Sequence, residues 1–257
     1  RSGWASRVHR RIVSAKDASE PVRESREGGT CHLEQAAAQG VVGAAAGVLL
    51  PREPGGELGL AALRGGEFGG GQRGHGALRT LEEGVLVRDP SPRYYAYRMI
   101  MGEHVQTGLV AAASVADYDS NRIRKHEFTR PDKEDDRVRQ IEALNAQTGP
   151  VLLAYPDSDE ADRLIAAATG SAPIADVDAD GVRHTTWAIE DAATIAGISR
   201  VFEAMPALYI ADGHHRSAAA SRVSAARRGA GADSAEHFLA VIFPARQMRI
   251  MDYNRVV

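Results

Sequence analysis

The pattern of apolar and polar residues becomes regular only after about residue 80. From there, apolar residues recur with the period of two that is typical of strands or the period of 3.6 that is typical of helices. We predict strands over Tyr94–Met101, Val105–Ala116, Val151–Tyr155, Arg183–Ile189, Ala207–Ala211 and His237–Pro244, and helices over Ser158–Thr169, Asp191–Ala204 and Ser217–Arg228. Because strands and helices mix without strict alternation, we expect an α+β (mixed α/β) domain with a mixed sheet and flanking helices.

A further helix is predicted to begin at Pro131, since proline suits the first helical position and acids crowd the first turns. Its apolar face is Val138, Ile141 and Leu144, and Gly149 is expected to stop it. Before it, Asp117–Arg130 is polar and irregular.

Three turns and ends complete the predicted elements. Gly102-Glu103-His104 is expected to join the first two strands into a hairpin. Asp176, Asp178 and Asp180 before Gly181 suggest an acidic turn, because the glutamate that a calcium loop requires is replaced by Trp187. Met248–Met251 is a candidate start of another strand. We interpret residues 81–257 as a catalytic-like domain. Because no closing element follows Met251, we expect this domain to be truncated at the C-terminus.

Residues 1–80 differ in composition from the rest of the chain. They hold 16 of the 26 glycines and no tyrosine, and Glu34–Leu50 could form an alanine-rich helix that glycines weaken. One explanation is a flexible, disordered extension. The explanation that we favour is a GC-rich gene translated in the wrong frame until about Ala77–Leu81. This hypothesis fails if no other reading frame gives patterned sequence upstream of Leu81. The G-x-G-x-x-G match at residues 69–74 lacks the strand and helix that a nucleotide fingerprint needs.

Bulk properties narrow the class of protein. Apolar residues make up 44% and charged residues 25% of 257, as in ordinary globular proteins. A single cysteine, Cys31, excludes an internal disulfide and fits a cytoplasmic setting. No apolar stretch approaches the ~20 residues of a membrane span. The net charge is −3, with −6 in residues 81–257, which disfavours nucleic acid as a partner.

The segment Asp212–Arg216 carries the strongest chemical signal. It follows an apolar strand and opens a helix, so we expect Asp212 to be the N-cap and Gly213 to let a ligand approach the backbone. His214, His215 and Arg216 then fall in the first turn, where cations oppose the helix dipole. A bound anion would compensate for this cost, and helix N–H groups with an arginine favour phosphate. The alternative is a surface helix start with solvated histidines.

A second cluster, Arg124–Arg130, places Glu127 among basic residues. Those charges favour an ionised carboxylate that His126 could orient, and such a group can take a proton from an attacking hydroxyl. The alternative is a solvated basic loop.

A metal site is the other chemical possibility, with ligands among His126, Glu127, Asp212, His214 and His215. Neighbouring helical residues diverge by about 100°, however, so His214 and His215 are not expected to share one ion. We therefore assign no protein-bound metal and expect Mg²⁺ to enter with a nucleotide.

These motifs resemble a known bacterial family. Leu208–Arg216, with Gln106–Val110 and Lys125-His126-Glu127, is similar to the signature of domain-of-unknown-function family 1015 over about residues 80–257. That family resembles the ParB/sulfiredoxin-like group, whose free-serine kinases pair a His-Glu element with Asp-Gly-x-His-Arg.

The resemblance implies roles for individual residues. Glu127 would be the base, Gly213, His215 and Arg216 would bind phosphate, and Asp212 would cap the helix or position the hydroxyl or metal. The implied activity is phosphotransfer from ATP or ADP with Mg²⁺ to a small hydroxylated metabolite such as free serine. A nucleotide-binding regulatory or ParB-like module without catalysis, and a metal-dependent hydrolase, remain alternatives. The oligomeric state stays open.

Overall fold

The structure is a computed structural model that describes residues 48–50, 59–63, 86–88, 93–144, 146–179, 181–228 and 233–250. Near the N-terminal end, strands β1 (Val48–Leu50), β2 (Gly59–Leu63) and β3 (Leu86–Arg88) form a small antiparallel sheet. The helix predicted over Glu34–Leu50 is therefore wrong at Val48–Leu50. The rest of that prediction and the G-x-G-x-x-G match lie outside the described residues.

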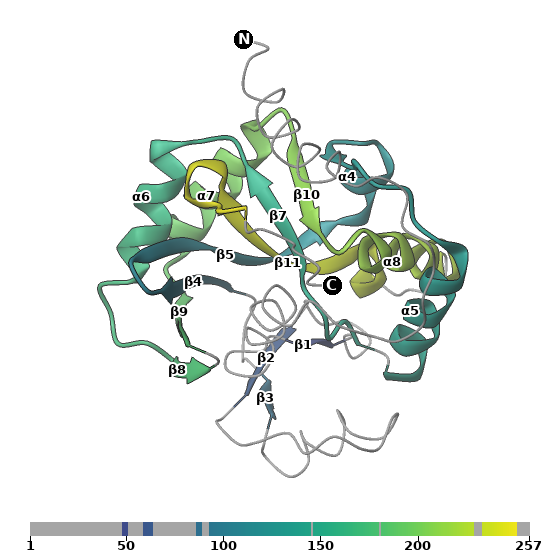
Figure 1. The fold of residues 1–257 in the computed structure, drawn as a ribbon, viewed down its shortest axis with the longest axis horizontal. Coiled ribbons are helices and arrows are strands. Elements are labelled where there is room, and N and C mark those ends of the chain that lie inside the picture. Colours follow the sequence, from purple (N-terminus) through teal and green to yellow (C-terminus); the bar gives the residue numbers. More distant parts are fainter. Residues whose placement is uncertain are drawn as a thin grey trace, which may run out of the picture.

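An eight-stranded mixed sheet forms the centre of the molecule (Figure 1). Its strand order is β6-β10-β7-β11-β5-β4-β9-β8. The strands are β4 (Tyr94–Met101), β5 (His104–Ser114), β6 (Ile123–Arg124), β7 (Val151–Tyr155), β8 (Ala175–Ala179), β9 (Val182–Ile189), β10 (Leu208–Asp212) and β11 (His237–Pro244). The predicted mixed α/β class is confirmed.

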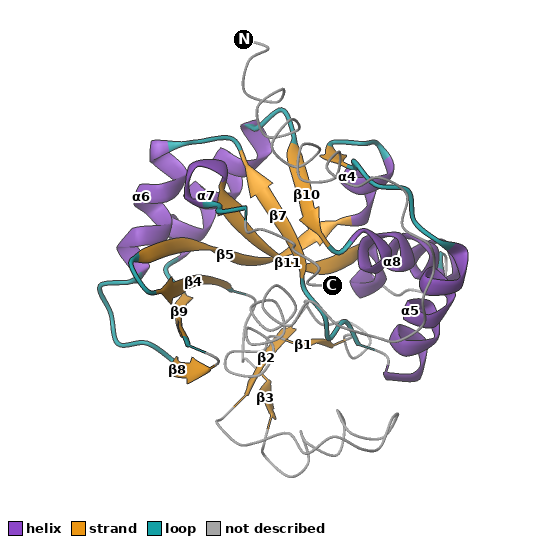
Figure 2. Cartoon of the chain, in the orientation of Figure 1, coloured by secondary structure: helices purple, strands orange, loops and turns teal. Residues whose placement is uncertain are grey.

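Helices flank this sheet in two groups (Figure 2). The first contains α6 (Asp159–Ala168) and α7 (Ala192–Ala204), and the second contains α4 (Val115–Asp119), α5 (Pro131–Leu144) and α8 (His214–Arg227). Short 3-10 helices η1 (Asp233–Glu236) and η2 (Ala245–Gln247) precede and follow β11. The predicted caps Ser158 and Asp191 accept backbone N–H bonds at the starts of α6 and α7.

Alternation along the strands produces two apolar layers. On one face, Leu109, Leu153 and Ile242 pack with residues of α4, α6, α7 and α8 in the main core. On the other, Tyr97, Val110, Leu239, Val241 and Phe243 form a second cluster with Tyr95. The hairpin predicted at Gly102 is present, with φ +58° at that glycine and antiparallel pairing of β4 with β5.

Three local predictions need correction. Asp117–Arg130 is not wholly irregular, since it contains the end of α4 and strand β6. Helix α5 ends at Leu144, before Gly149, and none of its residues, all of which are described, is fully buried. It packs beside α8, where Arg222 pairs with Glu134 and Asp135. Residues 248–250 form no strand.

The acidic segment before Gly181 is mostly a strand, not a turn. Asp176 lies on β8 and pairs across to β9, where its carboxylate accepts two hydrogen bonds from Arg183 and one from Thr185. Cross-strand charge pairing therefore accounts for this carboxylate without calcium.

This pairing predicts a measurable titration shift. The hydrogen-bonded Arg183 guanidinium is the main cause that lowers the pKa of Asp176 to about 2. Arg183→Gln should raise that pKa towards its ordinary value of 3.8, because the charged form loses its cation. An NMR titration of the Asp176 carboxyl measures the change. Arg200→Gln, which breaks an ion pair with Glu160 instead, is the control. An unchanged Asp176 pKa in Arg183→Gln would contradict the assignment.

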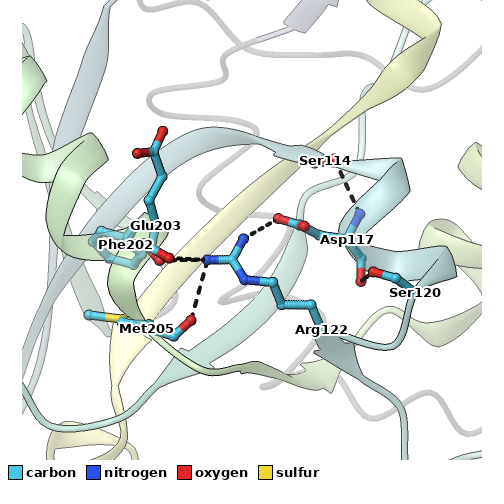
Figure 3. Close-up of polar contacts among 7 residues, drawn as sticks. All are labelled: Ser114, Asp117, Ser120, Arg122, Phe202, Glu203 and Met205. Carbon is cyan, nitrogen blue, oxygen red and sulfur yellow. Dashed lines mark hydrogen bonds and ion pairs between the residues drawn. The ribbon is translucent and has the colours of Figure 1, made fainter.

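The partly buried Arg122 holds the start of β6 in place. Arg122 donates from Nη2 to the carbonyl oxygens of Phe202, Glu203 and Met205 at 2.9, 3.0 and 3.3 Å, and from Nη1 to Asp117 at 2.5 Å (Figure 3). A cation at the carboxyl end of α7 binds carbonyl oxygens in and just after its last turn, where the helix dipole favours positive charge. Because Arg122 precedes β6 directly, this contact anchors the strand that leads into Lys125-His126-Glu127.

Candidate functional site

Two short segments, 85 positions apart, meet at one edge of the sheet. Strand β6 pairs in parallel with β10, with Ile123 opposite Leu208 and Arg124 opposite Tyr209. The carboxyl ends of parallel strands lie at the same edge, where open α/β sheets form their ligand sites. The residues that follow β6, His126 and Glu127, therefore lie beside the residues that follow β10.

The strand-to-helix turn at Gly213 is confirmed, but Asp212 is not its cap. The N-cap is Gly213, at φ +97°, which makes no side-chain capping hydrogen bond. Asp212 still belongs to β10, and its carboxylate accepts a 2.7 Å hydrogen bond from Arg216 Nη2. The positive φ of Gly213 turns the chain immediately after Asp212. The Asp212 carboxylate therefore contacts the first turn of α8 through Arg216. The N-cap residue of α8 consequently contributes no side-chain acceptor for the N–H groups of the first turn.

Arg216 lies across two glycines. A Cβ on Gly213 would sit 3.1 Å from Arg216 Nε and Nη2 and 3.2 Å from Val151 Cα, and one on Gly149 would sit 2.9 Å from Arg216 Cδ. The Arg216 Nε atom is buried and has no hydrogen-bond partner, although 29% of the side chain is exposed. An arginine has five N–H donors, so this guanidinium has capacity left for an anion.

Gly213→Ala should destabilise the protein by roughly 1–3 kcal/mol, because a side chain is strained at this φ and its Cβ meets Arg216 and Val151. Gly102→Ala is the matched control, since Gly102 also has positive φ but open space around it, and should cost only about 1 kcal/mol. Urea unfolding of both variants measures the difference. Equal losses would mean that the close contacts at Gly213 relax freely.

Glu127 contacts His214. The His214 ring is 3% exposed, and its Nδ1 lies 3.4 Å from Glu127 Oε2, while 39% of the Glu127 side chain is exposed. His214 Nε2 accepts a 3.5 Å hydrogen bond from the backbone N–H of His126. An Nε2 that accepts places the proton of a neutral imidazole on Nδ1, which is then able to donate to the Glu127 carboxylate.

His126 and His215 complete the contact between the two segments. The His126 ring packs edge-on against His214, with 4.4 Å between ring centroids. His215 turns away from His214 and accepts a 3.2 Å hydrogen bond at Nε2 from the backbone N–H of Arg130. The expected divergence of the adjacent histidines is therefore present. The imidazoles of His214 and His215, which each accept a backbone hydrogen bond from the 126–130 loop, hold that loop against the start of α8.

The basic residues of the loop have partners of their own. Arg130 donates twice to Asp132, at 2.9 and 3.2 Å, and Lys125 Nζ lies 3.9 Å from the centre of the Tyr118 ring. Burial raises the pKa of Tyr118, so it stays neutral beneath this cation. Lys125 and Glu127 are both exposed, and each also contacts a side chain of the protein, so the alternative of a solvated basic loop stays open.

Sequence reasoning missed three residues that shape the site. Gly149 accommodates Arg216, Arg122 anchors β6, and the buried Ser217 donates to the carbonyl oxygens of Gly213 and His214. Ser217 is the one with a signal in the sequence, as a small polar residue directly after the motif. The other two act through contacts with distant segments.

The site offers two kinds of ligand group. Arg216 and the start of α8 suit an anion. Among the residues that the structure describes, His126, Glu127 and His214 also form a group whose potential ligand atoms all lie within 4.8 Å of one another. Asp212 and His215 are not part of that group.

None of the described helices is long and apolar enough to cross a membrane.

Comparisons with known proteins identify the family. Neither a curated protein nor a solved structure matches the chain. A family model described as "Protein of unknown function (DUF1015)" matches residues 74–257, which include every residue of the site. The chain therefore belongs to the DUF1015 family of proteins of unknown function.

Proposed function

We propose that the protein is a nucleotide-dependent phosphotransferase that acts on a small hydroxylated metabolite such as free serine. The observation that carries this proposal is that the exposed carboxylate of Glu127 lies against His214, in the first turn of the helix that begins at Gly213 and carries Arg216. A base and an anion-binding helix start in one site are what hydroxyl phosphorylation requires.

The phosphates of ATP or ADP would lie at the start of α8. Gly213 leaves the backbone open to them, and Arg216 supplies charge-assisted hydrogen bonds. Mg²⁺ would arrive with the nucleotide, as is usual for a cation that is held largely by phosphates and water. Asp212 serves here as the residue that holds Arg216 in place, since it is not the helix cap.

Glu127 would act on the acceptor. The acceptor oxygen attacks the terminal phosphorus, the bond from that phosphorus to the bridging oxygen breaks, and the hydroxyl proton passes to Glu127. The products are the phosphorylated acceptor and ADP from ATP, or AMP from ADP. Positioning and charge neutralisation supply most of the rate in such transfers. The contact with His214 Nδ1 orients the carboxylate while one of its sides stays exposed.

Acceptor-dependent nucleotide turnover tests the proposal. The purified chain is incubated with ATP or ADP, Mg²⁺ and serine, and ADP or AMP is measured. Alanine, which differs from serine by the hydroxyl, is the matched acceptor and should give no turnover. Nucleotide binding without turnover on any hydroxylated acceptor would favour the regulatory module instead. Release of product without an acceptor, abolished by chelation, would favour the metal-dependent hydrolase.

A further inference from the structure

We infer that His126, Glu127 and His214 form a three-ligand site for a divalent transition metal of the zinc class. The three side chains come from the two segments that meet at the β6–β10 edge, and their potential ligand atoms lie within 4.8 Å of one another. Two imidazoles with one carboxylate is a ligand set found in zinc sites that keep a fourth position open.

The geometry needs only a small contraction. Zinc–ligand bonds of about 2.0–2.2 Å place neighbouring ligand atoms roughly 3–4 Å apart. Glu127 Oε2 and His214 Nδ1, at 3.4 Å, already meet this condition. The His126 ring lies against His214 at 4.4 Å between centroids and belongs to the more exposed loop, so it is the ligand that would adjust.

Metal binding has a consequence for the His214 ring. Ligation through Nδ1 uses the lone pair of that atom, so the ring proton must sit on Nε2. The hydrogen bond from His126 N–H to Nε2 would then be lost, and at 3.5 Å it is a weak one. The buried position of His214 meanwhile fixes the ring without help from the metal.

The surrounding charges permit a cation. Arg130 is paired with Asp132, and Arg216 is paired with Asp212. These two cations thus have carboxylate partners other than Glu127. Two nitrogen ligands favour zinc and its transition-metal neighbours over Mg²⁺ or Ca²⁺, which prefer oxygen.

Such a metal would compete with the proposed catalytic role of Glu127, because a ligated carboxylate accepts protons poorly. We therefore expect Zn²⁺ to inhibit the phosphotransfer. This consequence rests on the proposed function, whereas the binding itself does not.

Zn²⁺ titration of the metal-free full chain by calorimetry tests the site. One ion is expected per chain, and Glu127→Gln and His126→Ala should each weaken binding by at least roughly 10-fold. His215→Asn is the matched control, since this neighbouring imidazole points to Arg130 N, and should bind Zn²⁺ like the unaltered chain. Co²⁺ gives a second readout, because its visible spectrum should change in the two ligand variants but not in the control.

Two results would overturn the inference: no Zn²⁺ binding by the unaltered chain, or binding that neither ligand substitution weakens. His214 is buried, so its replacement risks the fold; the half-exposed His126 and exposed Glu127 keep the test independent of that risk. Because binding is measured without nucleotide, failure here leaves the phosphotransfer proposal standing, and absence of phosphotransfer leaves the metal site standing.

Discussion

Glu127→Gln should lower acceptor-dependent phosphotransfer by about 10²–10⁴-fold, the usual contribution of a general base. Glutamine keeps the size of the side chain and an oxygen able to accept from His214 Nδ1, but it cannot take the hydroxyl proton. The loss should appear in kcat, because the substitution leaves Arg216 and the start of α8 unchanged. Steady-state kinetics with ATP or ADP and serine measure the effect.

Two controls make this result specific. Glu142→Gln removes an exposed carboxylate on α5, away from the β6–β10 edge, and should keep full activity. Circular dichroism should show that both variants fold alike. If Glu127→Gln turns over substrate as fast as the unaltered chain, Glu127 is not the base.

Arg216→Ala should weaken nucleotide binding by roughly 10–100-fold, which corresponds to the ~1.5–3 kcal/mol of a hydrogen bond to a charged group. The guanidinium lies over Gly213 and Gly149 while 29% of the side chain stays exposed, so N–H donors beyond the one that Asp212 occupies can meet a phosphate. Calorimetric titration with ATP or ADP in Mg²⁺ gives the affinity.

Arg222→Ala is the matched control for this prediction. Arg222 lies on the same helix but pairs with Glu134 and Asp135 on α5. Its loss removes the same positive charge from α8 without touching the candidate phosphate site, so nucleotide affinity should stay close to the original value. Equal weakening by both substitutions would mean that only overall charge matters, and no weakening by Arg216→Ala would remove Arg216 as a phosphate ligand.

Much of the secondary structure after residue 90 follows from local sequence. The strands Tyr94–Met101, Val151–Tyr155 and His237–Pro244 begin and end where the apolar pattern predicts. The sequence pattern of these strands is strong, because burial on both faces gives a continuous apolar run and burial on one face gives clean alternation. Strand β6 has two residues in a polar segment, so no periodicity announces it.

The local part of the site was likewise predictable. A glycine between an apolar strand and a helix, followed by His-His-Arg, indicates a turn that exposes backbone N–H groups, and the structure has that turn at Gly213. The same rules gave a wrong prediction for Asp212, which is not the helix cap. A cap requires its own backbone geometry, and Asp212 remains in β10 while Gly213 adopts the left-handed conformation.

The sequence by itself therefore determined most of the elements, the turn and the chemical character of its residues, because these depend on interactions within a few positions. The tertiary structure decided which residues meet. Parallel pairing of β6 with β10 brings Glu127 to His214 across 87 positions and turns His215 towards Arg130 instead. That pairing depends on strand order and on contacts such as those of Arg122 with the end of α7, which no local period encodes.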